Sequence, residues 1–163
     1  MDIAIFRYAD WFLTTPAMLL STVAFMDYIR RKELQTKNDE TKELPTLKSF
    51  IINNWKPITW ILLCNAWMLL MGFLQELNAI DLVTSTILGF VGFIGMFSGI
   101  WIKYANNHKI NEYLWYYMCS SWSLYGVAPI FPNVIKNSMF NLLDIVSKNF
   151  YSVFLTQYIM NLA

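Results

Sequence analysis

The sequence contains few charged residues. Lys, Arg, Asp and Glu together make up 14% of its 163 positions, whereas soluble domains carry about 25%. Hydrophobic residues account for 56%, which predicts a membrane protein before any segment is delimited. The formal net charge is only +1, and no basic stretch has the interleaved aromatic residues of a nucleic-acid-binding surface. We therefore expect no nucleic-acid partner.

Cysteine and histidine are also scarce. Cys64 and Cys119 both lie inside apolar segments and are interpreted as small buried hydrophobic side chains. The single histidine, His108, stands in a polar turn. These residues form no disulfide or metal-binding pattern. We therefore expect no metal site. Met1 is not followed by a charged region and a cleavage site, so we also expect no signal peptide.

Long apolar segments make up most of the chain. Five of them are long enough to cross a bilayer as helices, so we expect a single all-α transmembrane domain over residues 1–163. The polar, charged stretch over residues 30–48 has no apolar period, which predicts a flexible cytoplasmic loop. The five predicted spans cover residues 3–29, 57–74, 82–102, 111–131 and 134–163.

The basic residues predict an orientation in the membrane. With five spans, the loop after the first span and the turn after the third lie on the same side, and they hold most of the Lys and Arg residues. The opposite loops hold only Lys136, together with Glu76 and Asp81. The positive-inside rule therefore predicts an extracellular N-terminus and a cytoplasmic C-terminus.

Two charged residues lie in the middle of the last predicted span. Asp144 and Lys148 are at positions i and i+4, on one face of a helix. A charge at that depth costs roughly 2.5–3.5 kcal/mol on insertion scales and needs a partner. The spacing leaves two interpretations open. The pair is either a structural ion pair between helices, or a lysine that forms a Schiff base with a carbonyl cofactor beside an aspartate counter-ion.

The first predicted span also concentrates polar residues. Arg7, Asp10 and Thr14 follow one another at i, i+3 and i+7, on one helical face. The Thr14 hydroxyl is one turn from Asp10 and could bond its carboxylate. Pro16 removes a backbone donor inside the helix, and Thr14, Thr15 or water could satisfy the group that it leaves open. So many polar residues within one span predict a functional site.

Three motifs carry a resemblance when they are taken in order. They are Arg7-Tyr-Ala-Asp-Trp11 followed by Thr14-Thr-Pro16, then Trp122-Ser-Leu-Tyr125, then Asp144-x-x-x-Lys148. This order resembles helices C, F and G of the microbial (type 1) rhodopsins, and it looks most like the rhodopsins of giant algal viruses. The resemblance covers nearly the whole chain, from the first span to the fifth.

The resemblance implies a retinal cofactor. Lys148 would hold all-trans retinal as a protonated Schiff base, and Asp10 and Asp144 would be its paired counter-ions. Two carboxylates near one cation are physically reasonable, because a positive charge favours their ionised forms. Arg7 would steady the carboxylates from the extracellular side, and Thr14 would bond Asp10 and help to control its protonation.

The resemblance also implies a retinal pocket. Trp11 and Trp122 would sandwich the polyene, and Tyr125 would form a hydrogen bond near Asp144. For the Met and Phe positions, ordinary packing remains an alternative. The other residues expected to line the pocket are Thr15, Asn65, Met68, Gly72 and Phe97.

The chain departs from the family pattern in several places. The resemblance begins at helix C, so the first two of seven helices are absent, and we expect low stability unless another chain supplies them. Ser21 stands where proton pumps of the family place a carboxylic proton donor, and a serine cannot titrate near neutral pH. Lys136 stands near the position of a release carboxylate, and Gly126 replaces a common proline.

These departures leave several functions open, none of them enzymatic. The first is a light-driven outward proton pump, and the second is a light-gated channel for protons or monovalent cations. A sensory receptor and a truncated, non-photoactive membrane protein are further alternatives. The expected partners are the lipid bilayer and retinal, and the sequence leaves open whether the chain forms a homo-oligomer.

Overall fold

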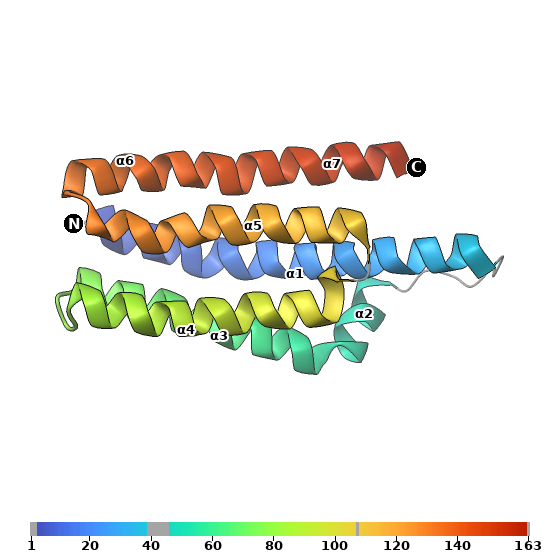
Figure 1. Ribbon diagram of the computed structural model, residues 1–163, viewed down its shortest axis with the longest axis horizontal. Helices are drawn as coiled ribbons and strands as arrows, with labels where there is room; N and C mark the ends of the chain where they lie inside the picture. Colours follow the sequence, from blue (N-terminus) through green and yellow to red (C-terminus); the bar gives the residue numbers. More distant parts are fainter. Residues whose placement is uncertain (1–2, 39–45, 107, 163) are drawn as a thin grey trace. The chain divides into compact units, whose positions relative to one another are not determined.

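The computed structural model describes residues 3–38, 46–106 and 108–162, and the regular structure in these ranges is helical (Figure 1). Residues 1–115 and residues 116–163 form two compact units, and one helix, α5, contributes to both. The elements are α1 (Ile3–Asn38), α2 (Leu47–Asn53), α3 (Trp55–Glu76), α4 (Leu82–Ile100), the π-helical η1 (Trp101–Ala105), α5 (Lys109–Val127), the 3-10 turn η2 (Ala128–Ile130), α6 (Asn133–Asp144), the π-helical η3 (Ile145–Phe150) and α7 (Tyr151–Leu162).

Glycines bring α3 and α4 close together in the first unit. A Cβ atom at Gly92 would lie 2.8 Å from the backbone oxygen of Cys64, so this position has no room for a side chain. Trp60 Nε1 donates to the Gly95 carbonyl at 3.1 Å, and Trp67 Nε1 donates to the Leu88 carbonyl at 3.0 Å. The two helices therefore run antiparallel at the short distance that small residues permit in membrane proteins.

Helix α1 packs against α3 in the same unit. Thr15 contacts Asn65, and Tyr8 lies beside Gly72. The residue nearer the start of α1, Tyr8, contacts the residue nearer the end of α3, Gly72, so these helices are also antiparallel. The middle of α1, over residues 19–29, holds most of its buried side chains, and Leu19 and Met26 are fully inaccessible to solvent.

The second unit is a helical hairpin. The final turns of α5 lead through η2 to Pro132, where the chain reverses before α6. Helix α6, the π-helical segment η3 and α7 follow one another without a break and form one continuous rod (Figure 1). Tyr125 of α5 stacks on Phe140 of α6, with ring centroids 6.0 Å apart and an angle of 20° between the ring planes.

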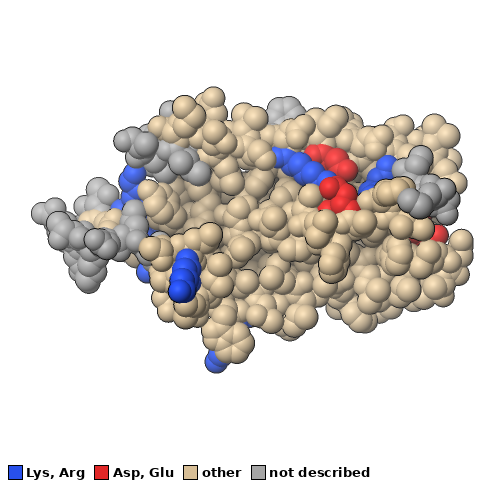
Figure 2. Space-filling model, turned by 180° about the vertical axis from the view of Figure 1, so that it is seen from behind, with Lys and Arg blue, Asp and Glu red and all other residues tan. Residues whose placement is uncertain are grey.

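Three helical segments among the described residues are long and apolar enough to cross a membrane: Ile5–Gln35, Trp55–Glu76 and Leu82–Ala105. Most of the surface seen in Figure 2 belongs to uncharged residues. The predicted fourth and fifth spans do form helices, α5 and the α6–η3–α7 rod. These two are not among the segments that are long and apolar enough to cross a membrane. They carry more polar side chains, so the count of five spans stays a prediction.

The predicted loop over residues 30–48 is wrong at both ends. Helix α1 continues to Asn38, and α2 begins at Leu47 after Thr46 accepts a hydrogen bond from the Ser49 backbone. The extension of α1 is stabilised by side chains one turn apart, because Asp27 pairs with Arg30 and Arg31. Residues 39–45 of the predicted loop lie outside the described residues.

Candidate functional site

The second unit brings together the central residues of the predicted site. Lys148 Nζ lies 3.6 Å from Asp144 Oδ1, so the two side chains form the ion pair that their spacing predicted. Both are partly accessible, with 23% of the Lys148 side chain and 27% of the Asp144 side chain exposed. A pair with this separation holds the amine beside a negative charge and leaves it room to react.

Tyr125 holds the carboxylate from the neighbouring helix. Its hydroxyl group donates a hydrogen bond to Asp144 Oδ1 at 2.7 Å and lies 2.8 Å from Ser147 Oγ. A phenol has a single hydrogen, which goes to the ionised carboxylate, so Ser147 donates to Tyr125. The predicted hydrogen bond between Tyr125 and Asp144 is therefore present, and Ser147 extends it.

The backbone around Lys148 is π-helical, which the sequence did not indicate. The segment η3 begins directly after Asp144 and contains Lys148 near its end. π-Helical turns are rare and occur frequently at functional sites. We find no residue pattern in the segment that would have distinguished it from an α-helix. In the same unit, Trp122 is 6% exposed and therefore buried, as expected of a pocket wall.

In the first unit, the hydroxyl groups of α1 bond to its own backbone. Thr14 Oγ1 donates to the backbone carbonyl of Asp10 at 2.9 Å, so the predicted bond to the Asp10 carboxylate is wrong. A threonine inside a helix reaches the carbonyl four residues earlier, and this local bond competes with longer contacts. Asp10 is exposed, and Arg7 is half-buried.

Three of the predicted pocket residues form one buried group. Asn65 Nδ2 donates to Thr15 Oγ1 at 2.9 Å, and Thr15 Oγ1 donates to the Trp11 carbonyl at 2.8 Å. Trp11 itself is 5% exposed. The Asn65 Oδ1 atom is buried and accepts no hydrogen bond from the described residues. This oxygen is an unused acceptor at a position that we expected to line the pocket.

The remaining predicted pocket residues have protein neighbours. A Cβ atom at Gly72 would lie 2.4 Å from the Tyr8 hydroxyl, so the glycine makes room for a tyrosine of α1. Phe97 is 2% exposed and packs on Phe93 with ring centroids 4.7 Å apart. Met68 is half-buried. These contacts are compatible with the ordinary packing that we left open for the Met and Phe positions.

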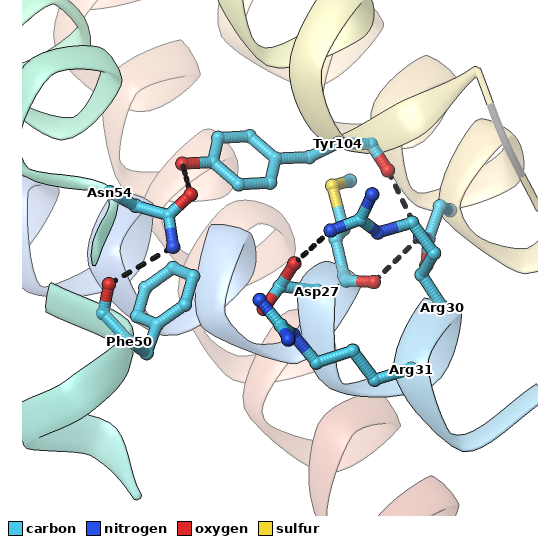
Figure 3. A network of polar contacts seen from close by, with 8 residues as sticks. Asp27, Arg30, Arg31, Phe50, Asn54 and Tyr104 are labelled. Atoms are coloured by element: carbon cyan, nitrogen blue, oxygen red, sulfur yellow. Dashed lines mark hydrogen bonds and ion pairs between the residues drawn. The ribbon is translucent and has the colours of Figure 1, made fainter. Parts of the chain in front are cut away.

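A polar network in the C-terminal half of α1 was not predicted from the sequence (Figure 3). Asp27 accepts hydrogen bonds from Arg30 and Arg31, both at 2.6 Å. The i, i+3 and i+4 spacing of these three residues could have revealed it. In the same region, Asn111 Nδ2 donates to the carbonyls of Met26 and Tyr104 and thereby links α5 to α1 and η1.

Comparison with known proteins agrees with this geometry. The family model described as bacteriorhodopsin-like protein matches residues 2–162, so the chain belongs to the bacteriorhodopsin-like family and is an integral membrane protein. Among solved structures, the crystal structure of viral rhodopsin OLPVRII matches with a TM-score of 0.77 and 27% sequence identity. The predicted resemblance to microbial rhodopsins, and to viral ones in particular, is thus confirmed.

The match covers unequal shares of the two proteins. It includes 96% of this chain but only 66% of the viral rhodopsin chain. No match was found among curated protein sequences.

Proposed function

We propose that this chain binds all-trans retinal as a protonated Schiff base on Lys148 and couples light-driven isomerisation to outward proton movement across a membrane. The observation that carries the proposal is the group formed by Lys148, Asp144 and Tyr125. Lysine is the side chain that condenses with an aldehyde. The carboxylate at 3.6 Å supplies the negative charge that a cationic imine requires.

The residues of the second unit fit such a cofactor by their chemistry. When bound, retinal would supply the absorption of visible light and a change of shape. Tyr125 orients the Asp144 carboxylate through a hydrogen bond, so the negative charge stays beside Lys148. Trp122, which is buried and lies one helical turn before Tyr125, offers a flat apolar wall.

The residues of α1 would handle the proton. Asp10 is proposed as the second counter-ion and the proton acceptor, because proton transfer from an imine needs a basic carboxylate. Arg7, one turn earlier, is proposed to steady the Asp10 carboxylate. Trp11 would cover the opposite face of the polyene from Trp122. Thr15, Asn65, Met68, Gly72 and Phe97 are proposed to line the rest of the pocket.

The proposed arrangement in the membrane follows the family. The five predicted spans would correspond to helices C to G of a seven-helix rhodopsin, with the N-terminus outside and the C-terminus in the cytoplasm. The uneven distribution of Lys and Arg supports this orientation. We propose that the helices that would complete the bundle lie in the share of the viral rhodopsin that has no counterpart here.

A light-gated cation channel is the second candidate, and Ser21 favours it. The Ser21 hydroxyl donates to the Met18 carbonyl at 2.9 Å and has no acidic proton to return to the cofactor. A pump without an internal donor would be reprotonated slowly from water. A channel has no need of that step.

The decisive test of cofactor binding is an absorption spectrum of the full chain expressed with all-trans retinal. We expect a visible band that Lys148→Ala removes completely. Lys136→Ala is the matched control, because it removes a lysine from the same helical rod and should leave the band in place. If the wild-type chain shows no visible band, the proposal fails and a non-photoactive membrane protein is the better description.

Voltage clamp separates the pump from the channel. A pump passes outward current under light at zero potential without an ion gradient, whereas a channel current reverses with the gradient. Asp10→Asn should abolish pumping, because an amide cannot accept the proton. Light-dependent acidification of the medium by that variant would contradict the role of Asp10.

A further inference from the structure

A second tyrosine of α5 contacts the π-helical segment, at its backbone. The Tyr117 hydroxyl donates a hydrogen bond to the Val146 carbonyl, with 2.5 Å between the two oxygen atoms. Val146 is the second residue of η3 and lies two positions before Lys148. A backbone carbonyl has two lone pairs, so it can accept a side-chain donor in addition to a helical one.

The two tyrosines hold the same short segment in different ways. Tyr125 bonds to side chains at both ends of the Asp144–Ser147 stretch, and Tyr117 bonds to the main chain between them. They are eight residues apart, which is about 12 Å along an α-helix. Helix α5 therefore contacts η3 at two successive residues, the Val146 carbonyl and the Ser147 side chain, and Lys148 is the next residue.

We propose that Tyr117 is a positioning residue for Lys148. This inference rests on the proposed attachment of retinal at Lys148. The direction of a lysine side chain depends on the path of its own backbone, and η3 departs from the regular α-helix that flanks it. A hydrogen bond to the carbonyl at 146 holds that path, whichever side chain stands there. Tyr117 acts on the chromophore through the backbone and does not touch it.

The test compares Tyr117→Phe with Tyr113→Phe in the full chain. Tyr117→Phe keeps the ring and its packing but removes the donor. Tyr113→Phe removes the same hydroxyl one turn earlier on α5, where the side chain is 72% exposed. This pair of variants separates the hydrogen bond from the general effect of losing a phenol.

The first measurement is amide hydrogen exchange over residues 145–151 in detergent, without retinal. Loss of one net hydrogen bond should accelerate exchange of this segment roughly fivefold in Tyr117→Phe. Tyr113→Phe should exchange at the wild-type rate. An unchanged rate in Tyr117→Phe would overturn the inference, because the carbonyl bond would then not hold the segment.

The second measurement uses the pigment formed with all-trans retinal. If Tyr117 positions Lys148, Tyr117→Phe shifts the absorption maximum and accelerates bleaching by hydroxylamine in the dark, by roughly the same fivefold factor. Tyr113→Phe changes neither. A purely structural role would not shift the maximum, so this readout distinguishes positioning from stability.

The two proposals fail in different ways. If the wild-type chain forms a pigment, and the Tyr117→Phe pigment has the same absorption maximum and bleaching rate, only the role of Tyr117 is overturned. Absence of any Lys148-dependent pigment in the wild-type chain would overturn the proposed attachment, and with it the role of Tyr117 toward Lys148.

Discussion

Two carboxylates of this chain pair with cations in contrasting ways. Asp27, near the C-terminal end of α1, accepts from two arginines at 2.6 Å, and only 2% of its side chain is exposed. Asp144, in the second unit, lies 3.6 Å from Lys148, and its side chain is 27% exposed. Asp27–Arg31 and Asp144–Lys148 share the i, i+4 spacing, and Arg30 adds a contact at i+3, so spacing alone does not distinguish the two carboxylates.

The contrast separates a short, buried ion pair from a longer, partly exposed one. Two short, charge-assisted hydrogen bonds fix Asp27 and leave its carboxylate no freedom to exchange partners. The Lys148 amine has a longer contact with Asp144 Oδ1, and the Tyr125 hydroxyl donates a hydrogen bond to the same oxygen. Asp27 therefore stabilises the C-terminal part of α1, whereas Asp144 is the carboxylate that we propose as the counter-ion of Lys148.

The largest effect is expected from Asp27→Ala. This variant leaves two guanidinium groups without their buried carboxylate. We expect a loss of about 3 kcal/mol in the free energy of unfolding, at the low end for a broken buried pair because the arginines are about one-third exposed. Denaturant unfolding of the detergent-solubilised chain measures it.

The matched control for Asp27→Ala is Glu33→Ala on the same helix. Glu33 is 37% exposed and lies 3.1 Å from His108 Nε2, so its removal should cost less than about 1 kcal/mol. Equal losses in the two variants would show that burial does not distinguish the Asp27 pair.

A smaller effect on stability is expected from Asp144→Asn. The amide oxygen still accepts from Tyr125, and the lost contact is a partly exposed pair at 3.6 Å, so the cost should stay below about 1 kcal/mol. The visible band should nevertheless shift, because the negative charge beside Lys148 is gone. A stability loss as large as that of Asp27→Ala, with an unshifted band, would reverse our assignment of the two carboxylates.

A third carboxylate extends the comparison to the surface. Asp81 caps the N-terminus of α4 and accepts from the Thr84 hydroxyl at 2.6 Å and from the Thr84 backbone at 3.0 Å. These hydrogen bonds lower the pKa of Asp81 below its ordinary value. The stabilisation is present above the unfolded-state pKa near 4 and is lost as the pH falls through the lower folded-state pKa.

The Asp81 effect is the smallest of the three, because the side chain is fully exposed. Wild type and Asp81→Asn should differ in thermal stability at about pH 6, and the difference should shrink toward about pH 3. A constant difference over this range would show that the charge of Asp81 does not contribute to the cap.

The sequence predicted some contacts of the site correctly and one of them wrongly. The pairing of Asp144 with Lys148 and the approach of Tyr125 were correct, because i, i+4 spacing and motif order survive small changes in helix geometry. The bond from Thr14 to the Asp10 carboxylate was wrong, because a nearby backbone carbonyl competed for the hydroxyl. Roles of Asp10, Arg7 and the pocket residues in binding retinal stay predictions.

By itself, the sequence determined the membrane class, the helical fold and the family, because composition, apolar length and motif order are properties of the chain alone. Only the tertiary structure decided which atoms meet. It placed Lys148 within a π-helical segment, Tyr8 against Gly72, and the Tyr117 hydroxyl within hydrogen-bonding distance of the Val146 carbonyl. These features depend on the close approach of neighbouring helices, which no spacing within one helix encodes.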